Sequence, residues 1–242
     1  MSSPPPPSAL LLGATGQVGS CILKELLASP YFSKVGEFGR KTTDPDKLAV
    51  GKEKLEQRTI DFENLDTSGL KDGKWDVVFI ALGTTAKAAG SAAAFEKIDR
   101  EYVINAARAA QGDYPQRLIY VSSAGANSKS SFLYPRSKGL TENGLAKLGY
   151  DEVIVFRPAL LAGVNRPDSR PAERIASVFT SVLSHISSSV EININTLAKS
   201  ILKAGYLNKL PPVARATQSG SDGAKFTLVD NAGALALATN SE

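Results

Sequence analysis

Residues 9–19 read Ala-Leu-Leu-Leu-Gly-Ala-Thr-Gly-Gln-Val-Gly, a short apolar run that leads into three glycines spaced three apart. Residues 10–12 predict a buried strand, and Val18, Ile22 and Leu26 recur at the four-residue spacing of one apolar helix face. A strand, a glycine-rich turn and a helix in this order form a unit whose helix N-terminus attracts phosphate groups. The stretch therefore predicts a nucleotide site, and the alternative is a plain strand-turn-helix.

Each of the three glycines meets a different geometric need of such a site. Gly13 permits a tight turn, Gly16 lets the backbone approach a pyrophosphate, and Gly19 lets the helix pack close to the strand.

The chain has 242 residues, of which 43% are hydrophobic, so it can bury one large core. Its 28 basic and 24 acidic residues give a net charge of +4 with no run of five like charges. This scatter does not predict nucleic-acid binding. An anionic cofactor or a weakly basic surface accounts for the balance equally well.

Single cysteine and histidine residues bound the chemistry. Cys21 excludes an intramolecular disulfide, and with His185 as the one histidine we expect no zinc cluster. No apolar run approaches the ~18 residues that span a bilayer. The four prolines of residues 4–7 predict a disordered lead-in over residues 1–7 and not a targeting sequence.

Short apolar runs alternate with helical stretches along most of the chain. Their near-continuous apolar character suits strands that are covered on both faces, as in a parallel sheet with right-handed crossovers. We expect an α/β, doubly wound parallel sheet (Rossmann fold) whose further strands are residues 34–39, 55–60, 76–82, 117–122 and 152–156. One long helix over residues 95–110 should bury a stripe made of Phe95, Ile98, Tyr102 and Ala106.

The texture of the sequence changes after Gly163. We expect one domain over residues 8–242, in which residues 163–210 form a small lid or substrate region with helices at 172–186 and 194–207. Residues 211–224 are predicted to be an exposed loop, and residues 226–229 an edge strand that precedes a short Ala-rich helix.

A Tyr-x-x-x-Lys spacing supplies the second chemical signal. Tyr134 and Lys138 lie four apart and share a helix face. An ammonium beside a phenol favours the phenolate and lowers a pKa that is ordinarily ~10, so the tyrosine can exchange a proton near neutral pH. Ser122 and Ser123 end a predicted strand, where a hydroxyl can hold a substrate oxygen. The spacing alone is common by chance, but its order after the glycine turn favours a catalytic site.

Together these motifs resemble the short-chain dehydrogenase/reductase superfamily, and the glycine spacing is similar to its extended and atypical branches. More narrowly, the chain resembles the atypical group that contains the human Tat-interacting oxidoreductase and the fungal mitochondrial-proteome proteins. The matching motifs are Ala81-Leu-Gly-Thr-Thr85, Phe95 to Val103, Ser131-Ser-Phe-Leu-Tyr134 with Lys138, and Phe156-Arg-Pro158 with Ser169-Arg-Pro-Ala-Glu173.

The resemblance implies roles for individual residues. Tyr134 would be the general acid, Lys138 would lower the pKa of Tyr134 and bind ribose hydroxyls, and Ser123 would orient the carbonyl, with Ser122 as the alternative. The implied cofactor contacts are Gly13, Thr15, Gly16, Gln17, Val18 and Gly19 at the pyrophosphate, Leu82 and Gly83 near the adenosine ribose, Tyr134 and Lys138 at the nicotinamide ribose, and Pro158, Ala159, Leu160 and Leu161 at the carboxamide.

The end of the second strand predicts which nicotinamide cofactor is preferred. An enzyme that uses NAD carries an acidic residue about 20 positions after the last glycine, where this chain has Gly39 followed by Arg40 and Lys41. A guanidinium there fits a 2′-phosphate, so we expect NADP(H) in preference to NAD(H), unless both cations are merely solvated. Asp61 and Phe62 should lie beside the adenine.

Two residues depart from the superfamily pattern. Asp99 stands where many members carry a relay asparagine, and its alternative role is an ion pair with Arg100 or Arg136. Pro135 disfavours helical backbone at Tyr134, which should therefore cap the helix with proline at its first position.

Two classes of function fit these features. The first is an NADP-dependent reductase that acts on a small aldehyde or ketone. The second is an NADPH-sensing regulator or scaffold that docks a protein partner. The resemblance also implies a peripheral position on the mitochondrial outer membrane, and a cytoplasmic position is the alternative.

Overall fold

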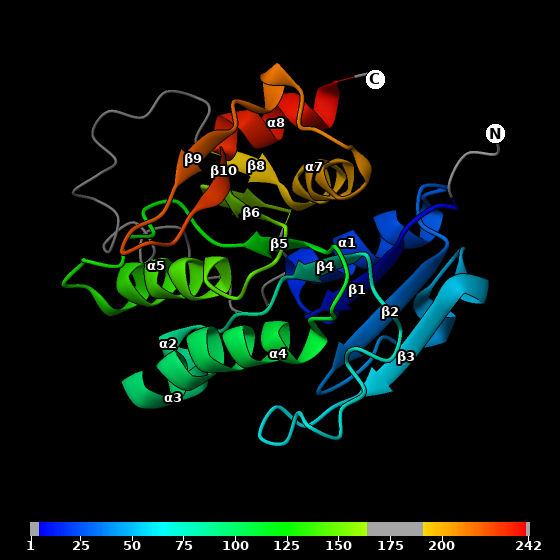
Figure 1. The fold of residues 1–242 in the computed structure, drawn as a ribbon, viewed down its shortest axis with the longest axis horizontal. Coiled ribbons are helices and arrows are strands. Elements are labelled where there is room, and N and C mark those ends of the chain that lie inside the picture. The colour runs from blue at the N-terminus through cyan, green and yellow to red at the C-terminus, as the bar shows by residue number, and fades with distance from the viewer. Residues whose placement is uncertain (1–4, 164–190, 241–242) are drawn as a thin grey trace.

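A computed structural model describes residues 5–163 and 191–240. In this part of the chain, eight strands form one sheet in the order β3-β2-β1-β4-β5-β6-β10-β9 (Figure 1). All neighbouring pairs are parallel except β10 and β9. The strands are β1 (Ser8–Leu12), β2 (Lys34–Gly39), β3 (Leu55–Thr59), β4 (Val77–Ile80), β5 (Arg117–Val121), β6 (Glu152–Arg157), β9 (Thr217–Ser219) and β10 (Phe226–Asp230). The predicted doubly wound fold is confirmed.

Helices cover both faces of the sheet (Figure 1). Successive side chains of β1 alternate between them: Ala9 and Leu11 join the core under one helical layer, whereas Leu10 and Leu12 join the core under the other. The first layer holds α1 (Gln17–Ala28), α7 (Ile194–Tyr206) and α8 (Asn231–Thr239). The second holds α4 (Tyr102–Ala110) and α5 (Leu133–Ala146), with α2 (Ala86–Ala89) and α3 (Ala92–Glu96) before them.

The other described elements are short. Two strands, β7 (Leu160–Ala162) and β8 (Glu191–Asn193), pair in parallel as a separate small sheet. Short 3-10 helices occupy Pro45–Lys47, Lys52–Lys54 and Pro212–Ala214.

The helix expected at 194–207 in a lid region lies instead in the core. It is α7, and it packs against α1, with Leu197 and Ile201 fully buried. A Cβ on Gly205 would lie 2.5 Å from the Phe79 ring, so the helix touches the sheet closely. Its wide apolar face covers one face of the sheet, which is why the helix packs in the same layer as α1. The helix expected at 172–186, together with most of the expected lid, lies outside the described residues.

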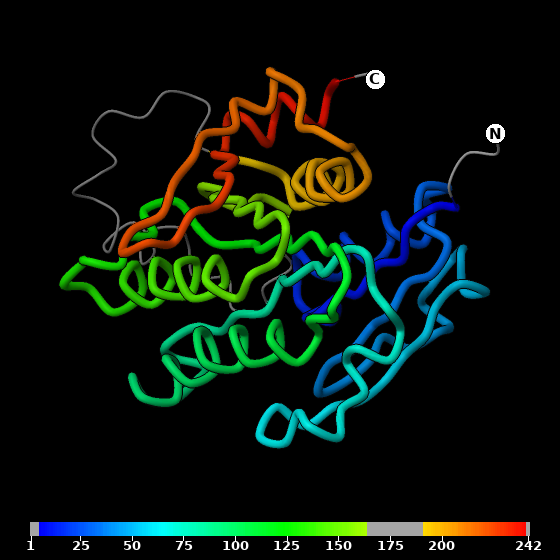
Figure 2. Tube along the Cα trace, in the orientation of Figure 1, coloured from blue at the N-terminus to red at the C-terminus, as the bar shows by residue number. Residues whose placement is uncertain are grey.

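The prediction that residues 226–229 form an edge strand is wrong. These residues lie in β10, which pairs with β6 on one side and with β9 on the other. Strand β9 falls within the stretch expected to be an exposed loop, and Figure 2 shows it beside β10 in orange. It has only three polar residues, Thr217 to Ser219, so no apolar alternation signals it, and short polar strands are common at sheet edges.

The expected long helix over residues 95–110 is interrupted by a π-helical turn, Lys97–Glu101, which we call the π-turn. Its longer repeat rotates the following residues. Phe95 and Ala106 are buried as predicted, but Ile98 and Tyr102 are only partly buried, and Asp99 and Val103 face the interior in their place. The π-turn therefore brings a carboxylate into the protein interior.

Candidate cofactor and catalytic site

The order in which the chain adds strands to the sheet reverses at β1: β2 is its neighbour on one side and β4 on the other. Ligands of open α/β sheets bind at such a point, outside the carboxyl ends of the strands. The glycine-rich turn follows β1 at this edge.

Close backbone contacts explain two of the glycines. Gly13 has a φ of +94°, and a Cβ there would lie 2.8 Å from the carbonyl of Ala81. A Cβ on Gly19 would lie 2.0 Å from the Gly13 oxygen. Any side chain at either position would push α1 and β4 away from the turn.

The N-terminus of α1 is suited to an anion. Gly16 caps the helix with its backbone in an extended conformation and has no side chain to bond the first amides, and the first turn of α1 holds no acidic residue. Thr15, Gly16 and Gln17 are exposed, Val18 is half-buried and Gly19 is buried. The positive end of the helix dipole thus lies at the carboxyl end of β1, which suits a pyrophosphate.

The end of β2 presents cations. Arg40 and Lys41 follow Gly39 and are exposed. The carboxylate of β2, Glu37, is buried and accepts hydrogen bonds from the Thr43 amide and hydroxyl, each at 2.7 Å, and from Gln57 Nε2 at 2.7 Å. Glu37 therefore organises the loop that carries the cations, and its oxygens are already bonded.

The predicted adenine contacts follow β3 at the same edge. The Ile60 amide donates to the Gly39 oxygen at 2.9 Å, which places Asp61 and Phe62 beside the end of β2. Asp61 is exposed, but Phe62 is only 7% exposed and its ring stacks on Tyr102 at 5.4 Å. Phe62 thus anchors this loop by packing its ring in the interior.

Leu82 and Gly83 lie between the glycine-rich turn and the residues predicted to be catalytic. They follow β4, and the Ala81 amide donates to the Leu12 oxygen at 2.9 Å. A Cβ on Gly83 would lie 3.3 Å from Asp99 Oδ1 and 3.5 Å from Lys138 Nζ.

Lys138 lies at the centre of the polar cluster. Its Nζ is 2.9 Å from Asp99 Oδ1 and donates to the Tyr120 hydroxyl at 3.1 Å. The side chains of Lys138 and Asp99 are 6% and 0% exposed. Tyr134 lies one turn earlier on α5, with its ring centroid 5.9 Å from Nζ and its ring against Phe95 at 6.0 Å.

The cluster keeps Lys138 charged. Burial disfavours the ammonium, but attraction to Tyr120 and Asp99 outweighs it and raises the pKa of Lys138 above its usual value. Burial raises the pKa of Tyr120, against the influence of Lys138.

Asp99 does not pair with either of the arginines considered from the sequence. Arg100 lies 3.6 Å from Glu96 and 3.7 Å from Glu101, and Arg136 donates to the Ser130 and Ser131 carbonyls. The π-turn directs Asp99 inward, away from both.

Ser122 and Ser123 lie just beyond the end of β5. Both hydroxyl oxygens are buried, and neither has a hydrogen-bond partner among the described residues. The Ala124 amide donates to the Pro158 oxygen at 2.8 Å, which joins this turn to the end of β6. Buried hydroxyls without protein partners are available to orient a substrate oxygen.

The predicted carboxamide contacts form the other wall of this turn. Pro158 is buried and the Ala159 amide donates to Asn231 Oδ1 at 3.0 Å. Leu160, 37% exposed, and Leu161 belong to β7.

The presence of Pro135 predicted that Tyr134 caps the helix, but Tyr134 does not cap α5. Phe132 is the N-cap, so Tyr134 and Pro135 are the second and third helical residues. A proline is tolerated here because the first four amides of a helix have no partner within it.

Two supporting residues of the site escaped the sequence analysis. Glu142, 1% exposed, accepts from Arg157 Nε at 2.8 Å and from its terminal nitrogen at 2.5 Å, which anchors α5 to β6. Its position one turn after Lys138 was a usable signal. Tyr120 gave none, because an aromatic residue is ordinary in a buried strand.

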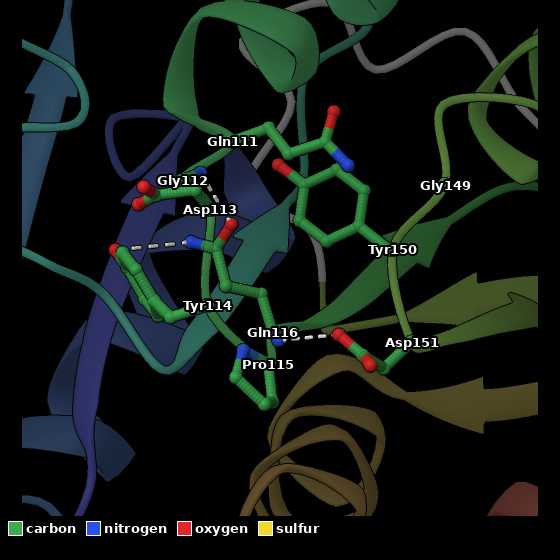
Figure 3. Close-up of a pocket in the computed structure, with 9 residues that line it drawn as sticks. All are labelled: Gln111, Gly112, Asp113, Tyr114, Pro115, Gln116, Gly149, Tyr150 and Asp151. Atoms are coloured by element: carbon green, nitrogen blue, oxygen red, sulfur yellow. Dashed lines mark hydrogen bonds between the residues drawn. The ribbon is translucent and has the colours of Figure 1, made fainter.

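A pocket of about 320 Å³ lies at the opposite edge of the sheet (Figure 3). Its walls are the segments that precede β5 and β6. The side chain of the buried Gln116 accepts from the Gly112 backbone amide at 2.7 Å and donates to the Trp75 carbonyl oxygen at 2.7 Å. The backbone amide of Gln116 donates to the Asp151 carboxylate at 2.9 Å. These bonds hold the two segments together, so we assign the pocket a structural role.

Known proteins match the chain over this same region. The sequence profile of a family described as NAD(P)H-binding matches residues 13–160, more than half of the chain. The chain belongs to this NAD(P)H-binding family. Protein HTATIP2 of Rattus norvegicus is 38% identical over 172 residues, covering 71% of this chain and 69% of the relative. The mitochondrial protein fmp52 of Emericella nidulans is 33% identical over 192 residues, covering 75% and 78%. The predicted resemblance to the atypical short-chain group is confirmed.

Solved structures share the fold of this NAD(P)H-binding chain. MoeE5 in complex with UDP-glucose and NAD has a TM-score of 0.57 at 15% identity, covering 84% of this chain and 73% of its own. An archaeal thiolation-reductase di-domain has a TM-score of 0.62 at 18% identity, covering 81% and 67%. At these identities the likeness concerns the fold alone.

No helix in the described ranges has the length and apolar character to cross a membrane.

Proposed function

We propose that the protein is an NADPH-dependent reductase of small aldehydes or ketones. Two observations carry the proposal: the Tyr134 ring lies beside Lys138 on α5, and two buried serine hydroxyls just beyond β5 have no partner among the described residues. An oxidoreductase-type fold that binds NAD(P) supports the same reaction class.

The residues divide the chemistry between them. Bound NADPH supplies a hydride for the carbonyl carbon of the substrate. The Ser123 hydroxyl donates to the carbonyl oxygen, with Ser122 as the alternative donor. The Tyr134 phenol gives its proton to the oxygen as the hydride arrives, so the product is an alcohol and the phenolate is reprotonated from solvent. Lys138 is charged and holds the polar cluster on which Tyr134 packs.

A preference for NADPH follows from the charges at the end of β2. Arg40 and Lys41 are exposed where a ribose 2′-phosphate would lie, and Glu37 is occupied by Thr43 and Gln57. A guanidinium recognises a phosphate in a bidentate manner, whereas an NAD site would need a carboxylate with free oxygens.

The site of action that we propose is the mitochondrial outer membrane, with the protein bound peripherally. The names of the fungal relatives include the word mitochondrial, which supports the organelle. Subcellular fractionation with a carbonate wash tests the position: release by carbonate is expected, and a wholly soluble protein would contradict it.

One titration and one assay test the activity. NADPH binding is followed by fluorescence, and its oxidation by absorbance across a panel of aldehydes and ketones, with Tyr134→Phe as the matched variant. We expect turnover that the variant loses while it still binds NADPH. Tight binding without Tyr134-dependent turnover would overturn the reductase and favour a cofactor-gated regulator that docks a protein partner.

A further inference from the structure

We propose that Glu37 is a positioning residue for cofactor selectivity, whose buried carboxylate fixes the loop that presents Arg40 and Lys41 to a 2′-phosphate. The inference rests on the proposed function in one respect, namely that these two cations recognise NADPH. It goes beyond that function because Glu37 acts from within β2 through the loop, so a change at a buried position should alter which cofactor is preferred.

Glu37 is a carboxylate inside the protein. It lies in β2, two residues before the strand ends at Gly39, and is only 1% exposed. Val35 joins the core under the layer that holds α1. Side chains two apart on a strand point to the same face, so Glu37 points under this layer as well. Burying a carboxylate is costly unless hydrogen bonds compensate for the lost water, so the partners of Glu37 show what it does.

Hydrogen bonds tie Glu37 to Thr43, a residue beyond the end of β2. Glu37 Oε1 accepts from the Thr43 backbone amide and from its hydroxyl, each at 2.7 Å. Glu37 Oε2 accepts from Gln57 Nε2 at 2.7 Å, and the same nitrogen donates to the Thr43 carbonyl oxygen at 2.6 Å. Side chains from β2 and β3 therefore hold Thr43 by its amide, its hydroxyl and its carbonyl.

Both ends of the loop with the cations are fixed in this way. The loop begins at the sheet, where the Gly39 oxygen accepts from the Ile60 amide at 2.9 Å. It ends at Thr43, which the contacts just described hold in place. Arg40 and Lys41 lie between these two points, and their side chains are exposed. The span is short, so its backbone has little freedom.

A fixed loop favours the cofactor that has a 2′-phosphate. A bidentate contact between a guanidinium and a phosphate requires a set geometry. A loop without anchors would have to be ordered each time NADPH binds, and that ordering opposes binding. NADH has a hydroxyl in place of the phosphate and gains little from the cations. The loss of Glu37 should therefore act on the choice between the two cofactors.

The contacts require a group that accepts on both oxygens. Gln57 Nε2 already uses its two hydrogens, one toward Glu37 and one toward Thr43. In Glu37→Gln the new NH₂ group faces either Gln57 Nε2 or the Thr43 amide, so two donors oppose each other in both orientations. The variant keeps the size of the side chain but breaks one of its contacts.

The test is a fluorescence titration of Glu37→Gln with NADPH and with NADH, without a substrate. We expect the affinity for NADPH to fall about tenfold or more and that for NADH to change less than about twofold. A general loosening of the fold would weaken both cofactors alike and leave the ratio of the two affinities in place. An unchanged ratio would therefore overturn the proposal.

The sign of the effect separates positioning from charge. Removing a negative charge near a phosphate should by itself strengthen NADPH binding, whereas a loss of positioning weakens it. Asp46→Asn is the matched control, because it removes an exposed carboxylate farther along the same segment. It should not lower the preference for NADPH. Tighter NADPH binding by Glu37→Gln, or an equal loss of preference in Asp46→Asn, would overturn the role.

A second variant decides the matter if Glu37→Gln does not fold. Thr43→Val removes one hydrogen bond to Glu37 but keeps the backbone amide bond and the shape of the side chain. The preference for NADPH should fall about threefold, which corresponds to the loss of a single hydrogen bond. An unchanged preference in this variant would contradict the positioning role.

The result can be separated from that of the activity assay, because binding needs no turnover. If the ratio shifts in Glu37→Gln but no carbonyl compound is reduced, the reductase proposal fails and the role of Glu37 stands. If the unaltered protein binds NADPH and NADH equally well, the preference proposed for Arg40 and Lys41 fails and the role of Glu37 fails with it.

Discussion

The glycine turn and the Lys138 cluster lie at the same edge of the sheet but are built in different ways. The turn uses residues close in sequence, Gly13 to Gly19. Its shape depends on backbone segments that approach so closely that Gly13 and Gly19 have no room for a Cβ atom. The cluster unites Asp99 of the π-turn, Tyr120 of β5 and Lys138 of α5, and depends on buried charge. The turn is therefore sensitive to an added side-chain atom at Gly13 or Gly19, whereas the cluster is sensitive to the loss of one charged partner.

The largest expected effect breaks the cluster. Lys138→Met leaves the Asp99 carboxylate buried and unpaired, which should lower the free energy of unfolding by about 3–5 kcal/mol. Adding Asp99→Asn removes the stranded charge and should restore most of that loss. Urea unfolding of both variants measures it, and equal destabilisation of the two would show that the charges are not coupled.

The second effect tests the turn by adding one atom. A Cβ on Gly19 would lie 2.0 Å from the Gly13 oxygen, so Gly19→Ala should cost about 1–3 kcal/mol of unfolding free energy and weaken NADPH binding. Gly90→Ala is the control for binding: its φ of +85° makes an alanine cost about 1–2 kcal/mol of backbone strain, but its Cβ meets no atom within 4 Å. It should leave NADPH binding unchanged, and similar binding by both variants would argue against a cofactor at the turn.

A smaller effect separates the turn from the cations next to it. Arg40→Glu should weaken NADPH binding about tenfold or more, close to 1.4 kcal/mol, and NADH binding much less, because NADH has no 2′-phosphate. Fluorescence titration with each cofactor measures the difference. Equal losses would contradict the proposed preference for NADPH.

The smallest effect is a pH slope that sharpens the description of the cluster. The pKa of Lys138 is raised in the folded protein, so its stabilisation is complete below the unfolded value of ~10.4 and is lost as pH rises toward the folded value. The raised pKa of Tyr120 acts in the same direction, since the unfolded phenol ionises first. Stability should therefore fall above about pH 10. Lys138→Met should reduce that slope by about one proton, and an identical slope in this variant would contradict the assignment.

Much of the site was predictable because its signals are local. The glycines report a turn that other residues cannot form, and the four-residue spacing of Tyr134 and Lys138 places them on one helix face whatever surrounds that helix. The strands were identified from continuous apolar runs such as residues 77–82. Strand β9 was missed because three polar residues carry no such pattern, and α7 was misplaced because an amphipathic helix does not indicate which surface it covers.

The sequence by itself determined the glycine turn and the order of the parallel strands of the main sheet. It also placed Ser123 at the end of a strand and Tyr134 and Lys138 on one helix. Only the tertiary structure decided that Asp99 faces Lys138, that Tyr120 completes the cluster, and that α7 packs on α1. The physical reason is distance along the chain. Backbone conformation and side-chain periodicity are set by near neighbours, whereas the partner of a buried charge is chosen when separate elements pack together and exclude water.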